Sequence, residues 1–352
     1  MGNLPTQEIV GLLQVGRTIA EIARHFKISE DVAQKITTQR FDGYYMMPSV
    51  NESRELIFRL VPLAPPKTTA ERVWRYAVAK DEKGLTQPYI QVHLPENIPG
   101  KKVKIYLVAD IHYGAKGHNS CVFEALLKHI GEKEHAFFVG VGDWLENTLA
   151  SSVAGAIYDQ ILPPDAQIKE FREKMRPLAH KCLVCMPGNH EDRTIKVAGI
   201  DQLEYGICEP LGIPYIGEPI YLDVFWRNKL FTFFVQHGRS GAQTKGGKLN
   251  AAARPLATSG FTMFAAMGHV HDPASVKNQK RCVEFKRDGK GEIVGMDIVQ
   301  REEYVVICGS SYRYFGTYGA RAGYSPTPPN IVPICVFEDN GKYYLDEKPI
   351  KL

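Results

Sequence analysis

The sequence predicts an α/β protein, with a layered α/β/β/α domain preceded by a small helical domain. From about Lys101 onward, short continuous apolar runs alternate with helical segments, which indicates strands that are covered on both faces. Near the N-terminus, apolar residues instead recur at helical spacing. We therefore expect a helical domain at residues 1–45, a linker and accessory segment at 46–100, and the main domain at 101–352.

The composition is that of a soluble globular protein. Of the 352 residues, 44% are hydrophobic and 23% are charged, which argues against disorder or a fibrous repeat. No apolar run approaches the roughly 18 residues of a membrane helix, and the N-terminus lacks a basic region followed by an apolar one. The seven cysteines show no disulfide-framework spacing. We expect a cytoplasmic protein with no membrane partner, and no pattern indicates its oligomeric state.

Cys182 and Cys185 form a C-x-x-C motif inside the apolar run "KCLVCMPG". This run is typical of a buried strand, and side chains three apart on a strand point to opposite faces. We therefore interpret both cysteines as structural residues that do not share a metal.

Two short helices are predicted between residues 18 and 40. Thr18 followed by Glu21 is a capping box that opens "IAEIARHF", and Ser29 is placed to cap "EDVAQKITTQR". Four apolar residues are spaced to pack the two helices together: Ala23, Ile28, Val32 and Ile36. The pattern resembles the helix-turn-helix of bacterial DNA-binding domains, with residues 30–40 as the recognition helix.

Lys27, Lys35 and Arg40 are the DNA contacts that this resemblance suggests. The alternative is a helical hairpin used for packing or dimerisation. The first 100 residues hold 12 Lys and Arg against 11 Asp and Glu, whereas a DNA-binding domain usually carries a basic face. Glu30 and Asp31 also lie at the start of the expected recognition helix, close to where phosphates would be. Both interpretations of the hairpin stay open.

Two further segments have readable local patterns. The proline cluster in "PLAPPKTT" breaks structure and is followed by "AERVWRYAVAKDEKG", which predicts one amphipathic helix. Much later, "KNQKRCVEFKRDGKG" predicts an exposed hairpin around Asp288 and Gly289.

Five predicted strands of the main domain end in residue types that bind metals. They are followed by Asp110 and His112, by Asp143, by Asn189 and His190, by His237, and by His269 and His271. Each residue alone has a structural interpretation, as an N-cap or a hydrogen-bonded histidine. The carboxyl ends of strands in an open α/β sheet lie along one rim, however, where ligand sites form. Five such ends together predict a metal centre.

These blocks resemble those of the calcineurin-like metallophosphoesterase superfamily. They are D-x-H at 110–112, G-D-x-x-E at 142–146, G-N-H-E at 188–191, a histidine at 237 and G-H-x-H at 268–271. They lie in order within roughly residues 103–310, and the one departure is Glu146, where many members carry aspartate. The resemblance implies a four-layer α/β/β/α sandwich and phosphoesterase activity.

The resemblance also implies two divalent metal ions. The first would be held by Asp110, His112, Asp143 and His271, and the second by Asp143, Asn189, His237 and His269. Two ions bridged by a carboxylate can share a hydroxide that attacks phosphorus in line, and they neutralise phosphate oxygens. Imidazole and oxygen ligands suit Mn²⁺, Zn²⁺ or Fe, and we take Mn²⁺ as the expected metal.

His190 is left over from the ligand set, and the resemblance gives it a catalytic role. The matching histidine in the family reaches the scissile phosphate, where it steadies developing charge or protonates the leaving oxygen, and Asp110 would orient it. Glu191 and Asp192 are expected to brace the turn and Arg193, and Arg193 is a candidate contact to the substrate.

Two segments bear on the substrate. The glycine-rich loop "GRSGAQTKGGKLNAAAR" carries Arg239, Lys245 and Lys248 and no acidic residue, so it is placed either to hold phosphates or simply to be solvated. The segment "SSYRYFGTYGARAGYSPTP" is dense in Tyr and Arg, which stack on bases or pack on a domain surface. This segment also resembles the tails of metallophosphoesterases encoded by phages and prophages.

We conclude from the sequence that the protein is a metal-dependent phosphodiesterase, with DNA as the expected substrate. A phosphodiesterase or phosphatase for cyclic nucleotides or other small molecules is the alternative within enzymes. A DNA-binding regulator with a vestigial metal site is a third interpretation, which the complete ligand set disfavours.

Overall fold

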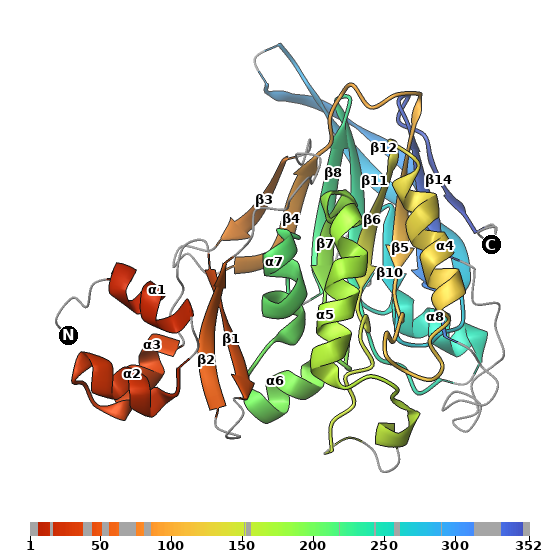
Figure 1. Ribbon diagram of the computed structural model, residues 1–352. Helices are drawn as coiled ribbons and strands as arrows, with labels where there is room; N and C mark the ends of the chain where they lie inside the picture. Colours follow the sequence, from red (N-terminus) through yellow and green to blue (C-terminus); the bar gives the residue numbers. More distant parts are fainter. Residues whose placement is uncertain are drawn as a thin grey trace. The chain divides into compact units, whose positions relative to one another are not determined.

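The computed structural model describes most of the chain (Figure 1). The described residues are 6–14, 17–37, 44–50, 56–62, 75–80, 86–150, 152, 156–217, 219–242, 244–256, 261–289, 291–312 and 332–347. The chain divides into two compact units, Met1–Thr68 and Thr69–Leu352. Within the described residues, no helix is long and apolar enough to cross a membrane.

The described part of the first unit contains three helices and one antiparallel hairpin. Its elements are α1 (Thr6–Gln14), α2 (Ile19–Phe26), α3 (Glu30–Thr37), β1 (Tyr44–Val50) and β2 (Leu56–Pro62). The capping box is confirmed, because the Glu21 backbone N–H donates to Thr18 Oγ1 and the Thr18 N–H donates to Glu21 Oε2. Lys27 ends α2 in the left-handed conformation, at φ 54°.

The helices of the first unit share a small apolar core. Ala23 and Ile36 are buried in it and Ile28 packs against it, as predicted. Val32 is the exception, because its side chain is only half-buried and the neighbouring Ala33 occupies the core position. A helical turn of 3.6 residues allows only one of two adjacent residues to face the partner helix.

The second unit is built on two mixed sheets. Their strand orders are β11-β12-β10-β9-β8-β4-β3 and β14-β13-β5-β6-β7. The strands are β3 (Arg75–Lys80), β4 (Thr86–His93), β5 (Lys102–Val108), β6 (Ala136–Val141), β7 (Cys182–Met186), β8 (Ile220–Trp226), β9 (Lys229–Gln236), β10 (Phe264–Met267), β11 (Ala274–Arg287), β12 (Ile293–Ile307), β13 (Ile334–Glu338) and β14 (Tyr343–Asp346). The helices are α4 (Ser120–Gly131), α5 (Pro164–Met175), α6 (Asp192–Ala198), α7 (Glu209–Leu211) and α8 (Lys245–Ala253), with short 3₁₀ segments at Ala156–Asp159 and Arg176–Lys181 and a π turn at Glu204–Cys208.

Three apolar layers hold these elements together and confirm the α/β/β/α architecture. The largest layer lies between the sheets, where Ile105 and Leu107 of β5 meet Leu222 and Val224 of β8. The alternate residues of β5 face the other way, toward α4 and α5. A third layer packs α8 on the outer face of β9, β10 and β12. Because side chains alternate along a strand, each continuous apolar run fills two layers at once.

The prediction of an amphipathic helix after the proline cluster is wrong at residues 75–80, which form strand β3. This strand pairs with β4, and β4 pairs in parallel with β8. Part of the segment assigned to a linker at 46–100 therefore belongs to the larger sheet of the second unit. Sheet pairing with Ile90 and Val92, both fully buried, outweighs the local helical spacing. The predicted hairpin around Asp288 is confirmed, since β11 and β12 pair along their length.

The two cysteines of the C-x-x-C motif do not point to opposite faces of β7, contrary to the prediction. Both lie in the apolar layer on the helix-covered side of the sheet, while Leu183 and Val184 between them face the other sheet. A register shift in the pairing of β6 and β7 breaks the alternation at this point. Among the described residues, no group of possible metal ligands contains a cysteine.

Candidate metal centre

The residues predicted to bind metal gather at the ends of five strands. Three of these strands, β5, β6 and β7, belong to the smaller sheet, and β9 and β10 belong to the larger one. The structure therefore corrects the expectation of a single sheet rim, because the site lies where two sheets end side by side. Within 4.8 Å, their ligand atoms form three groups: Asp110, His112 and His271; His112, Asp143 and His190; and Asp143, His237 and His269.

Unusual backbone conformations concentrate at this site. Nine non-glycine residues in the described chain have positive φ, and five of them are predicted metal ligands. These five are Asp110 (53°), His112 (48°), Asp143 (53°), His269 (71°) and His271 (53°). Each such residue costs on the order of 1 kcal/mol, so the rest of the fold must hold the turns in place. These sharp turns direct side chains from three loops, after β5, β6 and β10, toward one point.

Two glycines allow the loops to approach one another closely. Gly142 precedes Asp143 with φ 87°, and a Cβ there would meet the ring of His237. Gly188 does not have a positive φ; instead, a Cβ at this position would collide with the backbone and carboxylate of Asp143. The G-N-H-E block thus requires glycine because Asp143 packs directly against it.

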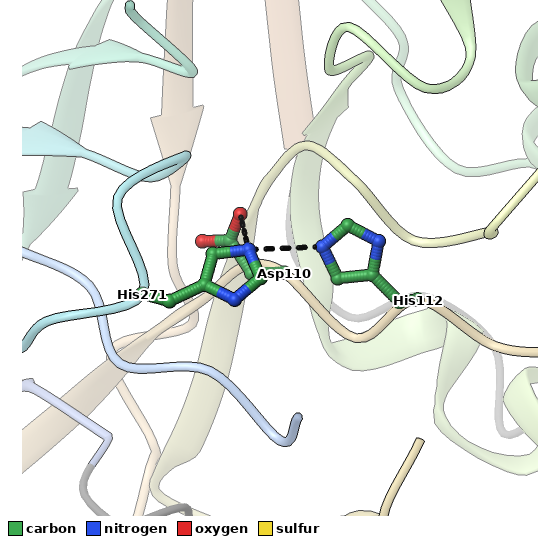
Figure 2. A group of neighbouring side chains, drawn as sticks. All are labelled: Asp110, His112 and His271. Atoms are coloured by element: carbon green, nitrogen blue, oxygen red, sulfur yellow. Dashed lines mark hydrogen bonds and ion pairs between the residues drawn. The ribbon is translucent and has the colours of Figure 1, made fainter. Parts of the chain in front are cut away.

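Asp110, His112 and His271 form one ligand group (Figure 2). His271 Nε2 lies 3.4 Å from Asp110 Oδ1 and 3.0 Å from His112 Nε2. His112 Nδ1 faces Glu146 Oε2 at 3.2 Å, which assigns the ring proton to Nδ1 and leaves the Nε2 lone pair toward His271. Two imidazole nitrogens facing each other beside a carboxylate are a donor set that fits a divalent cation.

The second group gathers around Asp143 and fits a cation equally well. His237 Nδ1 lies 2.8 Å from the Val141 carbonyl oxygen, so this nitrogen donates, and in the neutral ring that binds a metal Nε2 carries the lone pair. That lone pair points to Asp143 Oδ2 at 3.3 Å and to Asn189 Oδ1 at 3.1 Å. Asn189 Oδ1 also lies 2.7 Å from His269 Nδ1. Candidate ligand atoms therefore converge from four loops, after β6, β7, β9 and β10.

The electrostatics of the centre favour a positive charge. Burial alone would raise the pKa of Asp143, but His237 and His190 hold that pKa well below its usual range. Burial lowers the pKa of His237, yet Asp143 overrides this effect and raises the pKa to about 10. Buried carboxylates thus stabilise a cation at the position where the ligand atoms meet.

Glu146 contacts two of the histidines and fixes the orientation of their rings. Its Oε2 pairs with His112, its Oε1 accepts from Thr148 Oγ1 at 2.8 Å, and its carbonyl oxygen lies 2.7 Å from His190 Nδ1. Burial opposes ionisation of Glu146, but the bond to His112 and the charge of His190 lower its pKa to about 2. The longer side chain at this position reaches His112 from the loop after β6.

The ring of His190 is held by Glu146 and Arg193 rather than by Asp110, the partner expected from the sequence. Arg193 Nη2 lies 2.9 Å from His190 Nε2, and Arg193 Nη1 donates to the Glu146 carbonyl oxygen at 2.8 Å. The His190 backbone N–H donates to Asp143 Oδ1 at 2.9 Å. Burial lowers the pKa of His190 to about 4.

Of the two acids after His190, only Glu191 braces the turn, and within the described part of the chain neither acid makes a hydrogen bond or ion pair with the Arg193 side chain. Glu191 is fully buried, and its carboxylate accepts from the backbone N–H groups of Asp143, Leu145 and Gly188 at 3.1, 2.9 and 2.7 Å. Burial, with the nearby charge of Asp143, raises the pKa of Glu191 to about 7. Asp192 is half-exposed and makes a 3.7 Å ion pair with Lys196.

The candidate substrate contacts meet different outcomes. Arg239 and Lys245 are exposed, as a phosphate contact requires. Lys248 is buried instead, on α8, where its Nζ lies 3.0 Å from Asp272 Oδ2. The loop interpretation is therefore wrong from residue 245 onward: Thr244 caps a helix that the alanines favour, and Asp272 neutralises the lysine.

The sequence did not single out Asp272, nor the position of Tyr312 beside the metal centre. The Tyr312 ring lies edge-on to His112 and His271, with centroids 5.3 and 5.7 Å apart. In the sequence, the one sign of Asp272 is an acidic residue directly after the G-H-x-H block. The other Tyr and Arg residues of that C-terminal segment, and Arg40, lie outside the described residues.

The fold and the converging Asp, His and Asn side chains define a metal-dependent hydrolase of phosphoester bonds. Residues 103–288 match the family model for calcineurin-like phosphoesterases, and the chain belongs to this family. A comparison with individual curated proteins found no match.

Proposed function

We propose that the protein hydrolyses phosphodiester bonds and that its substrate is DNA. The observation that carries the proposal is the position of Tyr312 against His112 and His271. This places the start of a Tyr- and Arg-rich segment at the wall of the metal centre. Aromatic side chains next to a phosphodiester site suit the stacking of unpaired bases.

The metal ligands in this proposal are those implied by the family resemblance. Asp110, His112, Asp143 and His271 would hold one ion, and Asp143, Asn189, His237 and His269 the other. Two bound divalent ions, Mn²⁺ in this proposal, supply charge neutralisation of the phosphate and an activated water. Glu146 and the Val141 carbonyl fix the ring orientations of His112 and His237, so the chain presents the same lone pairs to every ion that binds.

His190 and Arg193 are proposed to contact the phosphoryl group. Their side chains touch one another at the edge of the Asp143 group, and the Arg193 guanidinium is partly exposed. A guanidinium presents a fork of donors that matches phosphate oxygens. With Nδ1 donating to the Glu146 carbonyl, His190 Nε2 accepts from Arg193 Nη2. Protonation of Nε2 would let it donate to a phosphate or leaving oxygen instead.

A substrate panel tests this proposal. Purified protein is incubated with single-stranded DNA, plasmid DNA, cyclic nucleotides and bis-nitrophenyl phosphate, each with Mn²⁺, Zn²⁺ or Mg²⁺. We expect DNA cleavage that is strongest with Mn²⁺ and is lost in Asp143→Asn. Asp192→Asn serves as the matched control, because it makes the same chemical change on a half-exposed side chain.

A small-molecule phosphodiesterase is the second candidate, and the burial of Lys248 favours it. That lysine is neutralised by Asp272, so one of the basic contacts expected for a polynucleotide is absent from the surface. Cleavage of cyclic nucleotides or bis-nitrophenyl phosphate with intact DNA would select this function. Hydrolysis of none of the four substrates with any metal would contradict both candidates.

We further propose that α2 and α3 form a DNA-binding helix-turn-helix. Lys27 and Lys35 are exposed on these helices. If both contact phosphates, Lys27→Gln with Lys35→Gln should reduce the slope of log affinity against log salt by about 1.8. The control is Lys128→Gln with Lys229→Gln, an equal charge change on exposed lysines of the second unit. An unchanged slope in the Lys27→Gln, Lys35→Gln variant would contradict DNA binding by α2 and α3.

A further inference from the structure

Strands β11 and β12 extend past the larger sheet as a two-stranded arm (Figure 1). β10 pairs only with Tyr304–Ile307 of β12, whereas β11 pairs with β12 from Ile293 to Ile307. The arm therefore has sheet neighbours only at its base. Its outer part, residues 279–300, is exposed or half-exposed throughout its described length.

One face of the outer arm is apolar. Val283 lies opposite Ile298, and Phe285 lies opposite Met296, so these four side chains share a face. Their exposed fractions are 53%, 60%, 57% and 66%. Ile293 and Val294, near the tip, are also more than half exposed. We call Val283, Phe285, Met296 and Ile298 the arm face. Such a patch on a ribbon marks an interaction surface.

The charges of the arm argue against a nucleic-acid partner. Residues 274–307 hold seven Lys and Arg against six Asp and Glu. On the face opposite the arm face, Lys286 pairs with Asp297 at 2.8 Å and Arg301 pairs with Glu284. Nearer the base, Lys277 pairs with Glu302 at 2.8 Å. An arm that binds phosphates would present unneutralised cations, whereas this one is nearly balanced.

We propose that the arm face binds the arm face of a second copy of this chain. A two-stranded ribbon with two adjacent apolar cross-strand pairs is self-complementary about a two-fold axis, the commonest symmetry of soluble oligomers. Ile293 pairs with Arg287 and so lies on the same side as the arm face. With it, five apolar side chains that are each more than half exposed offer on the order of 500 Å² per copy, so a pair buries about 1,000 Å², the lower limit for a specific interface.

The arm face also lies far from the proposed metal centre. Nine residues separate Ala274, at the base of β11, from Val283, which is roughly 30 Å of extended strand. A dimer formed through the arm therefore leaves the ligand loops uncovered. Substitutions on the arm face change no residue assigned to metal or substrate.

Sedimentation velocity of the full chain across roughly 1 to 100 µM measures the oligomeric state directly. We expect a dimer in the wild-type protein and at least about a 100-fold weaker dimer when Val283, Phe285, Met296 and Ile298 are all changed to Thr. Threonine keeps strand propensity, so the arm is retained. The control is Lys286→Ser with Asp297→Ser, on the opposite face, which should dimerise like the wild type.

Phe285→Lys alone, checked for folding by circular dichroism, provides a second variant and should weaken the dimer at least about tenfold. A wild-type protein that is monomeric over the whole concentration range overturns the proposal. So does a dimer that the arm-face variants leave unchanged. Loss of DNA affinity in these variants without a change in oligomeric state would assign the arm face to nucleic acid instead.

Discussion

Two turns at the candidate metal centre share one hydrogen-bonding pattern but are stabilised by different interactions. The turn at Gly188–Asp192 follows β7, and the turn at Gly268–Asp272 follows β10. In each, a strand-end aspartate accepts a backbone N–H: Asp143 accepts from His190, and Asp110 accepts from His269. Each turn also contains a buried acid, Glu191 or Asp272. We call them the β7 turn and the β10 turn.

The buried acids are neutralised in opposite ways. Glu191 accepts three backbone N–H groups from its own turn and from the loop after β6. Asp272 pairs with Lys248, a charged side chain on α8. The β7 turn is therefore held by neutral dipoles close to the site, whereas the β10 turn is tied to a helix on the outer face of the larger sheet. The two turns should therefore differ in how much stability a mutation of the buried acid or its partner costs.

The largest contrast is expected between alanine substitutions of the histidines in the two turns. His271→Ala removes a proposed ligand, so it should lose about one equivalent of bound metal along with activity. His190→Ala should slow hydrolysis on the order of 100-fold and keep both ions. Metal content by plasma mass spectrometry, with rates on the cleaved substrate, separates the two. Loss of metal in His190→Ala would instead make His190 a ligand, as its grouping with His112 and Asp143 allows.

Lys248→Met should have the largest effect on stability. It leaves Asp272 buried without its closest cation, which costs about 3 kcal/mol in the free energy of unfolding. Lys245, whose Nζ lies 3.6 Å from Asp272 Oδ1, limits the loss. Adding Asp272→Asn should recover most of it, and urea unfolding measures each step of this cycle. A double variant as unstable as the sum of the single ones would show that the two residues act independently.

Glu191→Gln should destabilise by about 2 kcal/mol, because the amide can accept only part of the three hydrogen bonds. The backbone partners cannot be substituted, so no second mutation in the β7 turn should restore stability as Asp272→Asn does in the β10 turn. Urea unfolding again provides the measurement. A neutral Glu191→Gln variant would mean that the carboxylate is not what braces the turn.

Asp192→Asn is expected to have the smallest effect, below about 0.5 kcal/mol. Its ion pair with Lys196 is 3.7 Å long and exposed to solvent, and such pairs contribute little. The same unfolding experiment compares it with the adjacent Glu191→Gln. Equal losses at the two positions would remove the distinction between the buried and the half-exposed acid.

The sequence predicted most of the residues that converge at the candidate metal centre and fewer of the contacts that surround them. Asp110, Asp143 and His237 were recognisable because each follows an apolar strand, a local pattern that does not depend on distant parts of the chain. The burial of Lys248 was not recognisable, because its partner Asp272 lies 24 residues away and a basic residue in a glycine-rich run usually faces solvent.

Strand β3 was missed for the same reason. Its pairing with β4 depends on where β8 lies, and helical spacing in the local sequence gives no indication of that. The same limit applies to the C-x-x-C motif, because its two side chains share a face only through a register shift between β6 and β7. Local sequence patterns predict helices and strands, whereas pairing with distant strands determines whether a segment forms a strand and which way its side chains face.

Both sheets contribute residues to the same candidate ligand group. The apolar interior between the sheets therefore affects the geometry of the site as well as the stability of the fold. His271 comes from the larger sheet, and Asp110 and His112 come from the smaller one. The side chains packed between the sheets, such as Leu107 and Leu222, therefore act as a spacer that fixes how far apart the two halves of the candidate ligand group are. A substitution that changes the volume of this layer should alter metal affinity although no ligand is changed. In turn, a bound ion would hold the two sheets together.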